Sequence, residues 1–402
     1  MYRALALILG MVVLISVLAG CSVAGGADLD KVSGLVVDAN TRFGFDIFKE
    51  LNKEDADSSV FMSPFSISTA LTMTYNGAAS TTLDGMGRAL GFDALDRSVV
   101  NESYKELLRH LEKVDSKTTL NIANSIWIRD GYPIKQGFLD LNKDTFDVLV
   151  RELDFSKSDA PDTINSWIKD KTSGMIEKMI DSIDTDTVMY LINAVYFKGQ
   201  WKYRFDPKDT FSATFQALNG QTQTVDMMSR KGTLEYTKGD NYQAVRLPYG
   251  SNKLSMYLIL PDEGININDF IDALDADKWQ KIRTSMTEVE DAMLQIPKFR
   301  LEYGIKNLNA GLAALGMEEA FGPGADFSDI HPGLFIARVL HKAVIEVNEE
   351  GSKAAGVTVV EMKESAAADQ VSFIANRPFV FVITDDTTGT ILFMGKLSEI
   401  SS

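Results

Sequence analysis

The residues that could carry out catalytic chemistry do not form a complete set anywhere in the sequence. Ser166 and Lys169 have the S-x-x-K spacing of a serine nucleophile beside a lysine base, but no K-T-G sequence accompanies them. No P-loop, G-x-S-x-G or H-E-x-x-H motif is present either. We therefore expect that the protein is not an enzyme. The competing hypothesis is a serine hydrolase that uses Ser166 and Lys169.

The composition argues against several classes of binding protein. Lys and Arg number 40 against 56 Asp and Glu, which gives a net charge of −16. Nucleic-acid binding needs clustered Lys and Arg to neutralise phosphates, so we expect no nucleic-acid partner. A single cysteine excludes an internal disulfide and a thiolate metal cage. Three histidines leave little for a histidine-ligated metal. We expect a monomer without a cofactor or a metal.

The single cysteine follows an apolar N-terminal segment. Residues 4–19 have the length of a signal-peptide core and are short for a membrane-spanning helix. They end in Leu-Ala-Gly-Cys21, which is similar to the lipobox of bacterial and archaeal lipoproteins. This predicts a lipoprotein signal peptide over residues 1–20, lipidation of Cys21 and an exported protein. The lipid would anchor it to the extracellular or periplasmic face of a membrane, with or without later shedding. The alternative is an ordinary signal peptide followed by a cysteine by chance.

The rest of the chain indicates one large domain. Residues 21–32 are small and polar enough for a flexible tether, and no second linker or repeat interrupts residues 33–402. Apolar residues recur at helical spacing mainly in the first half, for example between Leu35 and Leu51. Strand-like runs follow in the second half, at 244–247, 254–260, 292–296 and 343–347, and a hairpin is expected over 379–394. This order predicts an α+β fold rather than a doubly wound parallel sheet.

The segment before that hairpin has its charges sorted at a period of two. One phase is uncharged: Ser352, Ala354, Gly356, Thr358, Val360 and Met362. The other phase contains every charge of the stretch: Lys353, Ala355, Val357, Val359, Glu361 and Lys363. Alternate side chains of a strand point to opposite faces, so this segment can enter a sheet as a strand without burying a charge. The alternative is an inert, alanine-rich surface loop, which needs no such sorting.

Four segments, in order and at compatible spacing, resemble the serpin family of serine protease inhibitors. They are 60–77 (VFMSPFSISTALTMTYNG), 193–201 (NAVYFKGQW), the region from His341 to about residue 375, and 378–395. The chain is identified as a member of this family, of a prokaryotic lipoprotein type. The resemblance implies a single α+β domain with about three β-sheets, a mixed central sheet, about eight or nine helices and an exposed reactive loop at about 349–375.

The resemblance also implies an activity. A serine peptidase would attack the loop and form an acyl-enzyme, and the freed strand would then insert into the central sheet before hydrolysis finishes. By the family's usual distance from Glu349, the reactive bond joins Ser365 to Ala366. These small side chains suit elastase-like or subtilisin-like peptidases, and a cysteine peptidase is a further expected target class. The runner-up bond, Lys363–Glu364, would suit a trypsin-like enzyme. The alternative function is that of a non-inhibitory serpin acting as a binding or chaperone-like protein.

The resemblance also implies roles for the remaining site residues, and for the polar residues and the ion pair there is a purely structural alternative. The hinge comprises Glu349, Glu350, Gly351, Ser352, Ala354, Ala355 and Gly356. Ser63, Ser66, Asn193 and His341 match a polar network that gates opening of the sheet, although each could simply be a satisfied buried polar group. Trp201 and Lys298 match the top of the sheet, where Lys298 would pair with Glu349. A surface ion pair worth about 0–1 kcal/mol is the alternative there.

Overall fold

The computed structural model describes residues 26–351 and 371–400. Predictions that concern Cys21, the hinge from Ser352 onward and both candidate reactive bonds lie outside these residues.

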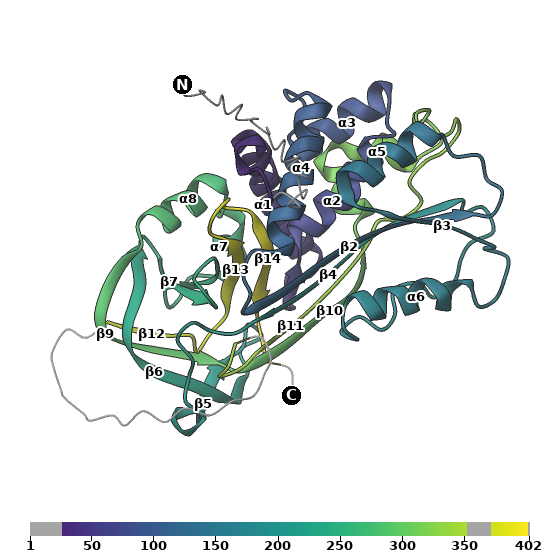
Figure 1. Ribbon diagram of the computed structural model, residues 1–402. Coiled ribbons are helices and arrows are strands. Elements are labelled where there is room, and N and C mark those ends of the chain that lie inside the picture. The colour runs from purple at the N-terminus through teal and green to yellow at the C-terminus, as the bar shows by residue number, and fades with distance from the viewer. Residues whose placement is uncertain (1–25, 352–370, 401–402) are drawn as a thin grey trace, which may run out of the picture.

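Nine α-helices occur in the described ranges, most of them in the first half of the chain (Figure 1). Their apolar stripes explain their positions. In the first helix, for example, Val36, Phe43, Ile47 and Leu51 are buried on one face. The helices are α1 (Gly34–Glu54), α2 (Pro64–Tyr75), α3 (Ser80–Leu90), α4 (Arg97–Glu112), α5 (Gln136–Phe146), α6 (Ala160–Lys171), α7 (Ile267–Asp272), α8 (Ala276–Thr284) and α9 (Asn309–Leu312).

The strands of the described chain form three hydrogen-bonded sheets. The largest has the order β1-β14-β13-β8-β7-β6-β9-β12, with β5 paired to β6; β12 runs parallel to β9 and makes the sheet mixed. The others are β3-β2-β4 and β10-β11. The bounds are β1 (Val60–Met62), β2 (Thr118–Arg129), β3 (Leu149–Leu153), β4 (Met189–Gly199), β5 (Phe211–Gln216), β6 (Thr222–Gly239), β7 (Tyr242–Tyr249), β8 (Leu254–Pro261), β9 (Thr287–Pro297), β10 (Phe299–Asn307), β11 (Leu340–Val347), β12 (Ser372–Ile374), β13 (Phe379–Asp385) and β14 (Ile391–Leu397). The predicted α+β class with a mixed sheet is confirmed.

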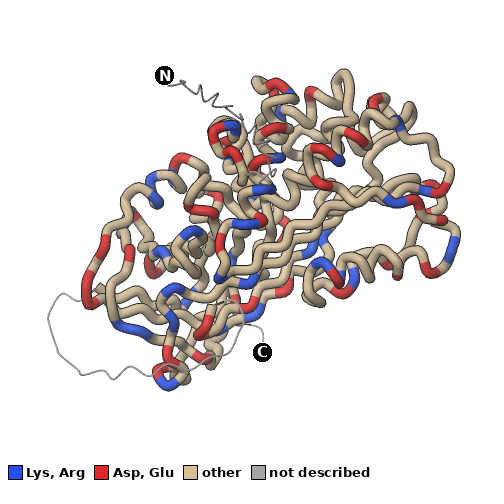
Figure 2. Tube along the Cα trace, viewed as in Figure 1, with Lys and Arg blue, Asp and Glu red and all other residues tan. Residues whose placement is uncertain are grey.

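The long strands β2, β4, β10 and β11 lie between two layers of helices. Helices α1–α5 lie above these strands in Figure 1, and α6 lies on the opposite face. Under α6, a small separate core forms around Trp127, Ile164 and Ile168. Figure 2 shows the two signs of charge interspersed along the described chain.

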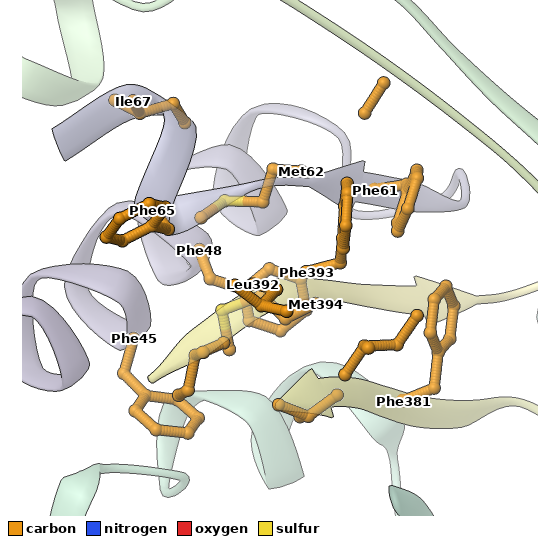
Figure 3. Packing of buried hydrophobic residues seen from close by; sticks show 14 of the residues in the cluster. Phe45, Phe48, Phe61, Met62, Phe65, Ile67, Phe381, Leu392, Phe393 and Met394 are labelled. Carbon is orange, nitrogen blue, oxygen red and sulfur yellow. The ribbon is translucent and has the colours of Figure 1, made fainter. Parts of the chain in front are cut away.

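The main core fixes α2 against the predicted C-terminal hairpin, which is present as β13 and β14. Phe61 of β1 stacks between Phe381 and Phe393, with ring centroids 5.5 and 5.6 Å away. In Figure 3, Phe61 and Met62 of β1 face Leu392, Phe393 and Met394 of β14, and Phe65 lies where β1 leads into α2. A side chain at Gly395 would lie 2.6 Å from the carbonyl oxygen of Val60, so the close approach of β1 to β14 depends on this glycine. These contacts hold the start of α2 against the hairpin, on the face of the long strands that α1–α5 cover.

The N-terminal end of the described chain corrects one prediction. Residues 28–32 were expected to be part of a flexible tether, but they are docked on α4. The amide of Asp28 donates to the buried carboxylate of Glu106 at 2.7 Å, and Lys31 lies 3.1 Å from Glu102. Residues 29–31 form a 3-10 turn closed by local backbone hydrogen bonds. None of the helices in the described ranges combines the length and the apolar character that crossing a bilayer requires.

Candidate functional site: the gap between β4 and β11

Strands β4 and β11 lie side by side without forming a common sheet. β4 is hydrogen-bonded to β2 and β11 to β10, and in the described part of the chain no ladder connects β4 with β11 (Figure 1). Each strand therefore presents an edge of backbone N–H and C=O groups toward the other. A single additional strand between them could pair with both edges.

A cavity of about 310 Å³ lies between the first parts of the two strands. Residues 186–193 line one side and residues 333–341 the other, and one face of α2 lines it as well. The lining is mostly apolar, with Ile67, Leu71 and Met189 among its members. The space next to the unpaired edges can thus receive small or apolar side chains.

Three of the four predicted polar residues, Ser66, Asn193 and His341, line this cavity, and Ser63 is hydrogen-bonded to two of them. The Nε2 atom of His341 on β11 accepts a hydrogen bond from the Ser63 amide at 3.1 Å. The Ser63 hydroxyl donates to the carbonyl oxygen of Leu392 at 2.7 Å and caps α2 by accepting from the Ser66 amide at 3.2 Å. The Ser66 hydroxyl in turn donates to the Oδ1 atom of Asn193 on β4. The two strands are therefore bridged through the N-terminus of α2.

The network extends to a residue that the sequence analysis missed. The Asn193 amide group donates to Asn124 Oδ1 at 2.6 Å, and Asn124 donates to the carbonyl oxygen of Phe146 at 2.8 Å. Asn124 lies on β2 directly opposite Asn193. Two asparagines at paired positions of neighbouring strands would have indicated this contact. The pairing becomes known only with the register of β2 and β4, which the sequence does not give. Both the structural and the gating interpretation of these residues require hydrogen-bonded side chains, and each of the five side chains has at least one hydrogen-bond partner in the network.

His341 is held neutral by its surroundings. Burial lowers the pKa of His341 from 6.5 to about 4, because the charged form loses its hydration. The hydrogen bond agrees with this, since Nε2 can accept from the Ser63 amide only in the neutral ring. Protonation of His341 would break the bridge between β11 and α2.

At the other end of the gap, β11 ends in a tight turn over residues 348–351. Asn348 and Gly351 exchange backbone hydrogen bonds of 2.9 and 3.2 Å. Gly351 has φ 132°, and a Cβ atom there would lie 2.1 Å from the carbonyl oxygen of Gly199 at the end of β4. Only glycine fits this position. The turn reverses the chain, so any strand that continued from it would run back alongside β11.

The predicted sheet-top tryptophan connects this turn to β4. The Trp201 indole N–H donates to the carbonyl oxygen of Asn348 at 2.9 Å. The backbone N–H of Trp201 donates to the carbonyl oxygen of Glu350 at 2.8 Å. The indole ring stacks on Tyr249 with a centroid distance of 4.4 Å. These contacts to the hinge turn close the gap at the end where the last residues of β4 and β11 lie.

The ion pair predicted between Lys298 and Glu349 is present, with 3.3 Å between Nζ and Oε1. The sequence analysis missed Thr210, whose hydroxyl donates to the same oxygen at 2.8 Å. Burial of Glu349 raises its pKa, but bonds from its own amide, Thr210 and Lys298 outweigh this and hold the pKa below its usual value. Glu349 is buried, whereas the Lys298 side chain is 36% exposed, so the pair lies at the boundary between the core and the solvent.

The residues of the hydrolase hypothesis are not arranged for catalysis. Ser166 and Lys169 are both exposed on α6, and Lys169 lies 3.0 Å from Glu177. The amine of Lys169 is thus engaged by a carboxylate rather than by the Ser166 hydroxyl. Among the described residues, no cluster of His, Cys, Asp and Glu has the arrangement of a metal site.

Comparisons with known proteins agree with this architecture. A family model described as serpin (serine protease inhibitor) matches residues 38–400. The leukocyte elastase inhibitor of Bos taurus is 33% identical over 374 residues, which is 90% of this chain and 98% of that protein. The native structure of the thermophilic serpin tengpin has a TM-score of 0.82 and 33% identity, covering 90% and 94% of the two chains. Human thyroxine-binding globulin, complexed with its hormone, has a TM-score of 0.83 and 27% identity, covering 92% and 100%.

Proposed function

The chain belongs to the serpin family, and on this premise we propose that it inhibits serine peptidases by inserting its cleaved reactive loop between β4 and β11. The observation that carries the proposal is the unpaired edge on each of these two strands, with the hinge turn at one end of the gap. Inserting one strand would add two ladders of backbone hydrogen bonds at once.

The sequence after the turn supports insertion. A strand that folded back from residues 348–351 would begin at Ser352, and its uncharged phase runs to Met362, a stretch as long as the 11-residue β4. The small residues of this phase, Ser352, Ala354 and Gly356, come first. A strand with no charge on one face can lie over the apolar cavity without the cost of burying an unpaired charge.

In the proposed reaction, the peptidase serine attacks the carbonyl carbon of Ser365 and expels the amino group of Ala366. The acyl-enzyme then has two fates, hydrolysis by water or capture when the freed strand inserts. We propose elastase-like or subtilisin-like serine peptidases as targets, because Ser365 and Ala366 are small, and cysteine peptidases with the same preference as a further target class. The inhibitor contributes no catalytic group of its own.

Incubation with an elastase tests this proposal. We expect a complex that survives SDS and has the mass of the peptidase plus the cleaved inhibitor, together with a released C-terminal peptide that begins at Ala366. A peptide that begins at Glu364 would move the bond to Lys363. Clean cleavage with no stable complex would contradict inhibition and support the alternative, a non-inhibitory serpin that acts as a binding or chaperone-like protein. Such relatives exist, since thyroxine-binding globulin carries a hormone in its structure.

We further propose that the protein is exported and anchored by a lipid on Cys21, on the basis of the Leu-Ala-Gly-Cys sequence alone. Because residues 28–32 are docked on α4, the tether would comprise only the residues between Cys21 and Asp28. Cys21→Ser should release the protein from membranes or leave it unprocessed. Unchanged partitioning of the variant into membranes, with a mature N-terminus elsewhere, would contradict the lipid anchor.

A further inference from the structure

The cavity between β4 and β11 is large enough to hold a small molecule. Its volume is about 310 Å³, roughly twice the volume of about 150 Å³ at which a protein cavity binds benzene. It extends through the layer of long strands, because α2 lines it on one face and Met179 and Ile180, in the core under α6, line it on the other. A molecule of about ten heavy atoms, the size of two fused rings, matches this volume.

The cavity also opens to the solvent. Its lining includes the exposed residues Asp186, Gly333 and Phe335, the last of which is 47% exposed. A ligand therefore has a path into the cavity that leaves β4, β11 and α2 in place. Because most of the lining is apolar, water inside would find few hydrogen-bond partners, and an apolar ligand would displace it favourably.

One donor on the wall of the cavity has no acceptor. His341 lines the cavity and is only 5% exposed. Its Nε2 atom accepts a hydrogen bond from the Ser63 amide, so the neutral ring carries its proton on Nδ1. Among the described residues, none accepts a hydrogen bond from this Nδ1 atom. A buried donor without an acceptor is costly, and a ligand that supplies the acceptor removes that cost.

We propose that this cavity is a regulatory site for a neutral, mostly apolar molecule of one or two rings that carries a single hydrogen-bond acceptor, such as a carbonyl oxygen. The rings would lie against the apolar side chains of α2 and β4, and the acceptor would bind the Nδ1–H group of His341. A carboxylate fits less well, because burying its charge is costly and Arg338, the one Lys or Arg of the lining, is already paired with Asp184.

A ligand in this cavity would oppose inhibition, a consequence that rests on the proposed insertion of the reactive loop. An inserted strand as long as β4 would reach Met189, which lines the cavity, so the ligand and the inserted strand compete for the same space. The ligand binds only while the gap is open and therefore favours the open state by mass action. Slower insertion leaves the acyl-enzyme more time to be hydrolysed.

Calorimetric titration of the intact protein with 1-indanone, without any peptidase, tests the site by itself. Indane is the matched probe, since it has the same two rings and no acceptor. We expect a Kd of about 0.1–1 mM for 1-indanone and about fivefold weaker binding of indane. Ala70→Phe fills the cavity from α2 and should abolish binding, whereas Ala310→Phe, at an exposed position of α9 outside the cavity, should bind as the wild type does.

Three results of this titration would count against the site. A wild type that does not bind 1-indanone, or an Ala70→Phe variant that binds it unchanged, would overturn the proposal, and equal affinities for the two probes would overturn the role of His341. If Ala70→Phe does not fold, crystals of the wild type soaked in 1-indanone decide the question. The carbonyl oxygen should lie within hydrogen-bond distance of His341 Nδ1, and a cavity without the ligand would overturn the proposal.

Reaction with an elastase tests the regulatory consequence, in 1-indanone at about ten times its Kd and with the elastase still fully active on a peptide substrate. Since about a tenth of the inhibitor is then free of ligand, the ratio of SDS-stable complex to cleaved protein should fall about tenfold. An unchanged ratio would overturn the regulatory role. A protein that forms no complex even without 1-indanone would refute inhibition and its regulation together, while the titration still decides whether the binding site exists.

Discussion

Acidification should destabilise this protein through His341. The pKa of this side chain is about 4 in the folded protein, against 6.5 in an unfolded chain, because the ring is buried. Below pH 6.5 the unfolded state therefore binds a proton that the folded state does not, and unfolding becomes more favourable. The stability is fully present above pH 6.5 and is lost as the pH falls toward 4.

The size of the effect follows from the same two values. At about 1.4 kcal/mol for each pH unit between them, the free energy of unfolding should fall by about 3 kcal/mol over this range. This is a large share of the 5–15 kcal/mol that holds a typical protein folded.

The assay compares the wild type with His341→Gln between pH 7 and pH 4, by chemical denaturation or by Tm. Gln cannot titrate, so the difference in stability between the two proteins should shrink by about 3 kcal/mol as the pH falls. His331→Gln is the control, because His331 is only partly buried, in a loop beside Tyr132. A difference between wild type and His341→Gln that stays constant from pH 6.5 to pH 4 would refute the reasoning.

Three further predictions concern the hinge. Glu349→Gln removes the charge that Lys298 contacts and should lower the free energy of unfolding by about 1–2 kcal/mol, measured by denaturation. Glu346→Gln, in which the lost ion pair with Arg300 is 4.0 Å long, should lower it less. Equal losses would count against a stabilising Lys298–Glu349 pair. Gly351→Ala forces a Cβ atom against Gly199 and should cost more than about 2 kcal/mol, whereas Gly304→Ala, where nothing lies within 4 Å, should be close to neutral in the same assay. Ala354→Arg places a charge on the uncharged phase and should turn the inhibitor into a substrate, seen as cleavage without an SDS-stable complex, while Ala355→Arg should retain most of the complex; equal damage would mean that the phases are assigned wrongly.

Much of the fold could be predicted because it depends on local patterns. The strand at 254–260 is a continuous apolar run and is present as β8, and the hairpin expected over 379–394 is present as β13 and β14. The α2 helix begins at Ser63, a favoured capping residue that precedes a proline. Each of these signals lies within about ten residues of sequence, which is the range that periodicity and capping can report.

Other features could not be predicted because their partners are distant in the sequence. Ser63 and His341 are 278 residues apart, and only the resemblance to a family placed them together. Asn124 and Thr210 are single polar residues whose partners are fixed by strand register and by the path of a loop. Lys396 shows the same limit, since a lysine in a strand is expected at the surface. It is completely buried instead, and its Nζ donates to the carbonyl oxygen of Ala56 at 2.8 Å.

The gap exists because β4 and β11 do not pair with each other. No pattern in the sequence predicts that two adjacent strands stay unpaired. The apolar and polar residues of β4 and β11 are compatible with a shared ladder as well as with separation. The two strands are instead connected through other elements: by the α2 bridge nearer their first residues and by the Trp201 and Glu349 contacts at their last residues.

Hydrogen exchange of β4 and β11, measured before and after cleavage of the reactive loop by an elastase, tests the central claim most directly. If the cleaved loop enters the gap, amides of Met189–Gly199 and Leu340–Val347 that face the gap should become strongly protected, and the Tm should rise. Unchanged exchange in both strands of the cleaved protein, with an unchanged Tm, would contradict the account.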